Sequence, residues 1–142
     1  MKRRAIIVTI VCAIIILGTA LFFYFLSVPE HISTSFADSA NIEFTDGTQP
    51  IDIEIENDDT IELIGIFHGK QIMRDSIGCP FGGVRVNLLS VDDELTLYPA
   101  GDDCPTVAIG RQFSGGYILL SEDENSRVRE ILIKYGITYS FV

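Results

Sequence analysis

Residues 121–135, SEDENSRVREILIKY, carry the clearest helical pattern outside the N-terminal segment. Ser121 and Glu124 have capping-box spacing, in which each side chain bonds the backbone N–H of the other residue. Apolar residues follow at i, i+3, i+4 and i+7 and form one stripe along a helix: Val128, Ile131, Leu132 and Tyr135. Gly136 is the residue type that commonly ends a helix. The stripe must be buried, so the chain needs a second apolar surface.

That second surface is predicted to be an antiparallel sheet. Residues 51–56, IDIEIE, alternate strictly, so the Ile side chains face a core and the acidic side chains face water. Shorter strand-like runs occur at 42–44, 84–89, 95–98, 106–113, 117–120 and 137–141. Turn residues such as Asp46 and Gly47 separate neighbouring runs, and short turns join antiparallel strands. We therefore predict an α+β domain over residues 41–142, with the C-terminal amphipathic helix packed on the sheet.

Residues 59–67 are predicted to form a short helix. Asp59 and Glu62 have capping-box spacing, with Asp in place of the usual Ser or Thr. Gly69 then supplies a helix stop. Short apolar runs of this kind also fit a strand, so a strand is the alternative here.

Residues 5–26 contain no charge over 22 positions and follow the three basic residues at positions 2–4. As a helix this run would be ~33 Å long, against a bilayer core of ~30 Å. We therefore predict a transmembrane signal-anchor, so that the chain binds the cell membrane through residues 5–26. Basic residues favour the cytoplasmic side, which makes residues 1–4 a cytoplasmic tail and places the domain outside the cytoplasm.

Residues 27–40 are rich in Ser and Thr and show no periodicity, so they are predicted to be a flexible linker. The alternative to an anchor is a signal peptide cleaved near Ala37, which would release a secreted domain. The apolar core of a signal peptide is ~7–15 residues long, and the run here is longer. Its length favours the single-pass anchor.

The charge of the chain is concentrated after residue 26. All 20 acidic residues lie there, with seven of the ten basic ones, which gives this part a net charge of −13. Such a field repels nucleic acid and anionic lipid headgroups and attracts basic groups. We expect no nucleic-acid partner and a basic protein or peptide partner. The alternative is that this charge serves solubility and selects no partner.

Cys79 and Cys104 are the only cysteines after residue 26, and a proline follows each. Two cysteines in an exported domain most simply form a disulfide, which we predict. A redox or metal-binding thiolate is the alternative. It would favour Cys-x-x-Cys spacing or basic neighbours, whereas Asp102 and Asp103 precede Cys104 and would raise the pKa of its thiol.

No catalytic, cofactor-binding or metal-ligating residue is assigned from the sequence. The acidic clusters lack the twelve-residue calcium loop with its central Gly and terminal Glu. His68 has no nucleophile motif beside it and is expected at the end of the short helix. Our first hypothesis is a membrane-anchored extracytoplasmic binding or accessory module for a protein or peptide. The alternatives are a small carboxylate-based hydrolase and a cation-binding or sensing ectodomain.

Overall fold

The computed structural model describes residues 2–45, 49–74, 78–110 and 114–137. The chain divides into two compact units, Met1–Glu30 and His31–Val142, and each is described by itself. The first unit contains helix α1, Lys2–Ser27. Among the described residues no helix combines the length and the apolar character that a membrane span needs, so the structure does not support the transmembrane part of the prediction.

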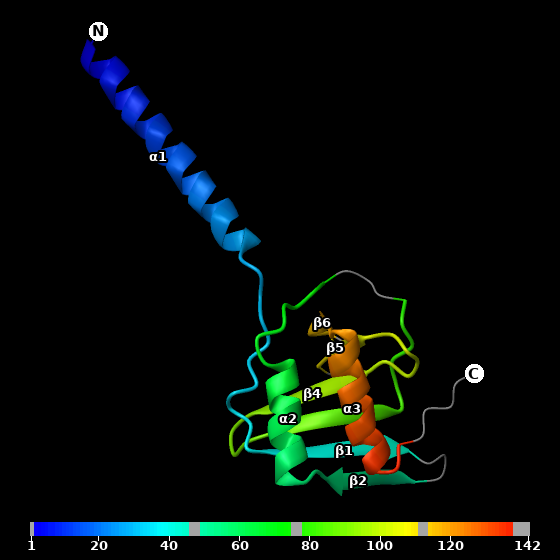
Figure 1. Ribbon diagram of the computed structural model, residues 1–142. Helices are drawn as coiled ribbons and strands as arrows, with labels where there is room; N and C mark the ends of the chain where they lie inside the picture. The colour runs from blue at the N-terminus through cyan, green and yellow to red at the C-terminus, as the bar shows by residue number, and fades with distance from the viewer. Residues whose placement is uncertain (1, 46–48, 75–77, 111–113, 138–142) are drawn as a thin grey trace. The chain divides into compact units, whose positions relative to one another are not determined.

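The second unit is built on a six-stranded antiparallel sheet with the order β2-β1-β3-β4-β5-β6 (Figure 1). Its strands are β1 Ser39–Thr45, β2 Pro50–Glu54, β3 Val84–Leu89, β4 Glu94–Pro99, β5 Thr106–Ile109 and β6 Gly116–Leu119. Strands β3 to β6 form a meander, and β1 lies between β2 and β3. The α+β class and the antiparallel sheet are therefore confirmed.

Parts of three predictions lie outside the described residues. These parts are the turn at 46–47, the end of the run at 106–113 and most of the final strand at 137–141. Ile137 is described, and it is buried without belonging to a strand.

Two helices, α2 (Asn57–Phe67) and α3 (Glu122–Lys134), cover one face of the sheet (Figure 1). The capping box of Ser121 and Glu124 is present in full at the start of α3. Helix α2 confirms helix over strand for this segment, but its predicted capping box is wrong. The helix begins two residues earlier than predicted, and its N-cap, Glu56, makes no side-chain capping bond.

The core lies between this helical layer and the sheet. Its largest fully buried apolar side chains are Ile42, Val86, Leu88, Leu97, Val107 and Ile118 from the strands, with Leu63, Phe67, Val128, Ile131 and Leu132 from the helices. Burying one such side chain contributes roughly 1.5–3 kcal/mol relative to exposure. The apolar stripe of α3 is thus buried on the sheet, as its spacing predicts.

The folded unit begins earlier than the sequence predicts. Ile32 and Thr34, which fall in the expected linker at 27–40, are buried. The backbone N–H of Ile32 donates to the carbonyl of Lys70 at 2.9 Å, and the Thr34 hydroxyl donates to the carbonyl of Ile64 at 2.9 Å. Residues 31–34 therefore pack against the end of α2 and the segment after it, and β1 begins at Ser39, inside the expected linker.

Candidate functional site

The predicted disulfide between Cys79 and Cys104 is present, with Cα atoms 6.3 Å apart. It joins the segment before β3 to the turn between β4 and β5. The backbone N–H of Gly101 donates to the carbonyl of Pro80 at 2.8 Å beside it, and Phe81 forms an isolated bridge with Ala100. Three adjacent contacts therefore hold this segment against the sheet.

The acidic clusters of the sequence are spread over several surfaces. Their exposed members are Asp52, Glu54, Glu56, Asp58, Asp92, Asp93, Glu94, Asp102, Asp103, Glu122 and Asp123. Within the described ranges, no group of three or more His, Cys, Asp or Glu side chains is placed to hold a metal ion. Most of these carboxylates are solvated side chains on strands and turns.

Asp59 is the exception, because it is buried between α2 and α3. Its Oδ2 accepts from the Nζ of Lys134 at 2.7 Å and from the hydroxyl of Tyr135 at 2.8 Å. Lys134 first, and Tyr135 second, lower the pKa of the Asp59 carboxyl below its ordinary value, because both donors stabilise its charged form. Burial raises the pKa of Tyr135. Local spacing suggested a helix cap for Asp59, whereas its partners lie 75 and 76 residues away.

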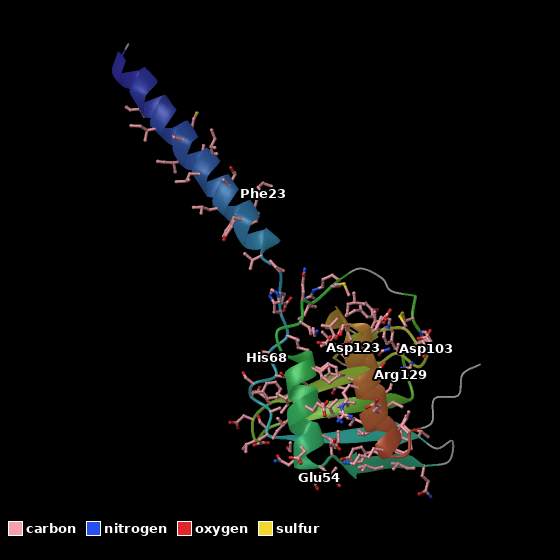
Figure 2. The ribbon with its side chains drawn as sticks, viewed as in Figure 1. Phe23, Glu54, His68, Asp103, Asp123 and Arg129 are labelled. Carbon is pink, nitrogen blue, oxygen red and sulfur yellow. A yellow bond between two sulfur atoms is a disulfide. The ribbon has the colours of Figure 1, made fainter. Side chains whose placement is uncertain are left out.

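His68 lies at the C-terminal end of α2, as the sequence predicts (Figure 2). Its Nδ1 is 3.3 Å from the hydroxyl oxygen of Thr34. The ring therefore helps to hold the chain where it enters the folded unit. This contact gives His68 a structural role.

The face of the sheet away from α2 and α3, here called the outer face, has two unlike halves. Over β5 and the start of β6 it is covered: Ala108 is fully buried, and the rings of Phe81 and Tyr117 lie 5.3 Å apart, whereas Leu119 at the end of β6 is exposed. Met73 also exchanges two backbone hydrogen bonds with Tyr117, at 2.7 and 2.9 Å, along the edge of β6. Gly116 permits this approach, since a Cβ there would lie 2.5 Å from the carbonyl oxygen of Met73.

Over β2, β1 and β3 the outer face carries a polar network. Glu43 and Asp52 are direct partners across the strands. The Nδ2 of Asn87 donates to Glu43 at 2.7 Å, and Arg85 pairs with the same carboxylate at 3.2 Å. The Nδ2 of Asn41 donates to Asp52 at 2.8 Å. Neighbouring like charges are costly on a sheet, and separate donors for each carboxylate offset that cost.

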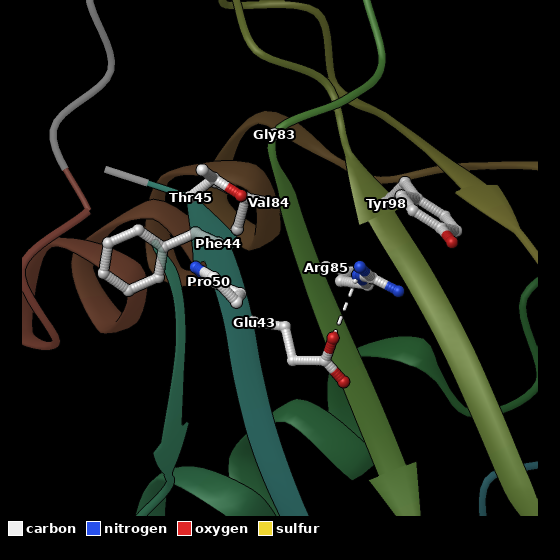
Figure 3. Close-up of a pocket in the computed structure, with 8 residues that line it drawn as sticks. All are labelled: Glu43, Phe44, Thr45, Pro50, Gly83, Val84, Arg85 and Tyr98. Atoms are coloured by element: carbon white, nitrogen blue, oxygen red, sulfur yellow. Dashed lines mark ion pairs between the residues drawn. The ribbon is translucent and has the colours of Figure 1, made fainter. Parts of the chain in front are cut away.

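Two hollows border this network. One, of about 270 Å³, is lined by the residues labelled in Figure 3, which include both members of the Glu43–Arg85 ion pair. The other, of about 360 Å³, is lined by Ser39, Ala40, Asn41, Asp52, Glu54 and Leu89. We name Glu43, Asp52 and Glu54 the acidic patch. Its carboxylates accept hydrogen bonds and attract cations, so cationic side chains are its chemical complement.

The sequence predicted the outward direction of Asp52 and Glu54, because alternation along one strand sets it. It did not single out Glu43, Asn41, Asn87 or Arg85. Those residues come together in the polar network through strand pairing, and the position of β1 between β2 and β3 was not predicted. No family model matches the chain, and no curated protein or solved structure shows significant similarity to it.

Proposed function

We propose that this chain is a non-enzymatic binding or accessory module that holds a basic protein or peptide on its acidic patch. The observation that carries the proposal is the outer face over β2 and β1, where Asp52 and Glu54 are exposed beside Glu43. The charge of the chain after residue 26, −13, attracts basic partners over a longer range.

We further propose that residues 5–26 tether this module to the extracytoplasmic side of a membrane. This part of the proposal rests on the sequence, which has an uncharged run of 22 residues after three basic ones. The disulfide between Cys79 and Cys104 fits an oxidising compartment outside the cytoplasm.

The tether is tested by fractionation of cells that express the full-length chain. A membrane-spanning chain stays in the pellet after an alkaline carbonate wash, whereas a peripheral or secreted chain is released. Protease added to intact cells or spheroplasts should then digest the folded unit. Release by the wash would contradict the tether and leave the binding proposal standing.

Binding is tested with a lysine-rich synthetic peptide and the full-length chain. The variant E43Q/D52N/E54Q removes the charge of the patch, and D58N/D92N/D93N removes three charges from exposed positions elsewhere. Exposed ion pairs of the peptide with Asp52 and Glu54, at ~0.5 kcal/mol each, predict about fivefold weaker binding for the first variant only. Binding should also weaken as salt rises from about 0.1 M, where the screening length is ~10 Å, toward 1 M. Equal losses in the two variants would show that net charge acts without the patch.

A further inference from the structure

Strand β2 lies at one end of the sheet and pairs with β1 alone among the described strands. A terminal strand presents one row of backbone groups that another strand can pair with. At the opposite edge of the sheet, Met73 forms backbone hydrogen bonds with β6. Among the described residues, none covers the edge of β2 in this way. The edge of β2 is therefore a surface on which an extended segment fits.

One hydrogen bond determines which backbone groups of β2 face this free edge. The N–H of Ile55 donates to the carbonyl of Ala40 at 2.9 Å, in register with the β1–β2 ladder. Backbone groups alternate in direction along a strand, so those of residues 51 and 53 also face β1. The N–H groups of Asp52 and Glu54 consequently face away from β1.

The ends of this edge limit the length of any added strand. Pro50 has no N–H to offer. At the other end, the N–H of Glu56 donates to the hydroxyl oxygen of Tyr135 at 2.8 Å. This direction agrees with the alternation: the N–H of Ile55 points toward β1, so the N–H of the next residue, Glu56, points away from it. Asp52 and Glu54 thus supply the two outward donors of the edge, and an added segment needs about three paired residues.

The side chains beside this edge indicate the chemistry of the added segment. The hollow of about 360 Å³ next to β2 contains the carboxylates of Asp52 and Glu54. Asn41 lines it as well, and its amide nitrogen donates to Asp52. Neighbouring strands lie ~4.8 Å apart, so a lysine or arginine side chain from an added strand is long enough to reach over β2. Such side chains carry several donors and no acceptor, which complements this set of acceptors.

We infer that β2 accepts an extended basic segment of the partner as an added strand, with its backbone bonded at Asp52 and Glu54 and a basic side chain over the hollow. The inference rests on the proposed function and adds the conformation of the partner. A second copy of this chain is a poor occupant, because antiparallel pairing of β2 with itself would bring the same carboxylates together.

The experiment uses the full-length chain with its disulfide intact and a peptide of alternating lysine and threonine residues. A matched peptide has the same sequence and charge but is N-methylated at consecutive residues, so that neither edge of the peptide can pair as a strand. On the protein, Asp52→Pro removes an outward N–H, and Asp52→Asn loses the same charge while keeping that N–H. Proline is tolerated on an edge strand where its nitrogen faces solvent. Circular dichroism checks that both variants fold, and the N-methylated peptide needs no variant at all.

We expect the N-methylated peptide to bind about tenfold more weakly than its parent, and Asp52→Pro to bind the parent about tenfold more weakly than Asp52→Asn. Equal binding of the two peptides would overturn strand addition and leave the acidic patch as a charge-based site. Failure of both peptides to bind at low salt would overturn the proposed function together with this inference. A dimer in sedimentation that Asp52→Pro abolishes would identify a second copy as the occupant and would also overturn the inference.

Discussion

The two edges of the sheet are finished in different ways. At the β6 edge, Met73 bonds the backbone of Tyr117, Phe81 packs on the Tyr117 ring, and the disulfide holds the same segment in place. At the β2 edge, charged side chains border backbone groups that no described strand pairs with. An edge that is covered contributes to stability. Charged side chains along an open edge oppose pairing with a strand of like charge, so only a segment of opposite charge suits the β2 edge.

The strands near the two edges also differ in burial. All four residues of β5 are buried, whereas β2 alternates between exposed and half-buried positions. We therefore expect the β5–β6 end to carry more of the folding free energy and the β2 end to tolerate substitution. Three predictions test this difference.

The largest expected effect comes from truncating the same residue type at the two ends. Ile118 in β6 is fully buried, whereas Ile53 in β2 is half-buried. Ile118→Ala should lower the free energy of unfolding by about 4 kcal/mol, and Ile53→Ala by about 1–2 kcal/mol. Denaturant unfolding monitored by circular dichroism measures both. Equal losses would mean that the two ends share one evenly packed core.

The next effect is the loss of the disulfide. In the chain-entropy model, closing a loop of this length, with a sequence separation of 25 residues, stabilises by about 3.5 kcal/mol. Replacing Cys79 and Cys104 by Ser should therefore lower the unfolding midpoint strongly. Cys12, a free and exposed cysteine, provides the control, and Cys12→Ser should leave the midpoint unchanged. A small loss in the double variant would show that the contacts of Phe81 and Gly101 hold the segment without the covalent bond.

The smallest effect concerns Asp59, which joins α2 to the end of α3 near β2. Asp59→Asn should cost about 1–2 kcal/mol at about pH 7, because it loses charge-assisted bonds to Lys134 and Tyr135. The pKa of Asp59 is lowered in the folded state. Its stabilising contribution is therefore complete above the unfolded-state pKa of ~3.9 and is lost as pH falls through the lower folded-state pKa.

The measurement for Asp59 compares wild type with Asp59→Asn at two pH values. The difference in unfolding free energy should be full at about pH 7 and shrink as pH falls below the unfolded-state pKa of ~3.9 toward the lower folded-state pKa. Lys134 contacts Glu56 as well, so Glu56→Gln is the matched control for an exposed partner of the same cation. If the difference in unfolding free energy stays constant with pH, the loss in Asp59→Asn comes from altered packing or hydrogen-bond geometry and not from the lost carboxylate charge.

Local patterns in the sequence determined most of the secondary structure. The capping box and stripe of residues 121–135 predicted α3, and the alternation at 51–56 predicted β2 with its acidic side facing water. The disulfide was also predictable, because only two cysteines follow residue 26. The helix and strand inferences depend on residues within a few positions of one another. The disulfide inference depends on there being only two cysteines to pair.

Only the tertiary structure decided how these elements combine into a surface. It placed β1 between β2 and β3, which brings Glu43 beside Asp52 and Asn87 beside Glu43. It also turned Asp59 from an expected helix cap into the buried partner of the half-exposed Lys134. It packed residues 31–34, which resemble a linker, against the folded unit. The physical reason is that burial and strand order depend on contacts between segments that are distant in the sequence. Periodicity and capping residues are local patterns and do not predict those contacts.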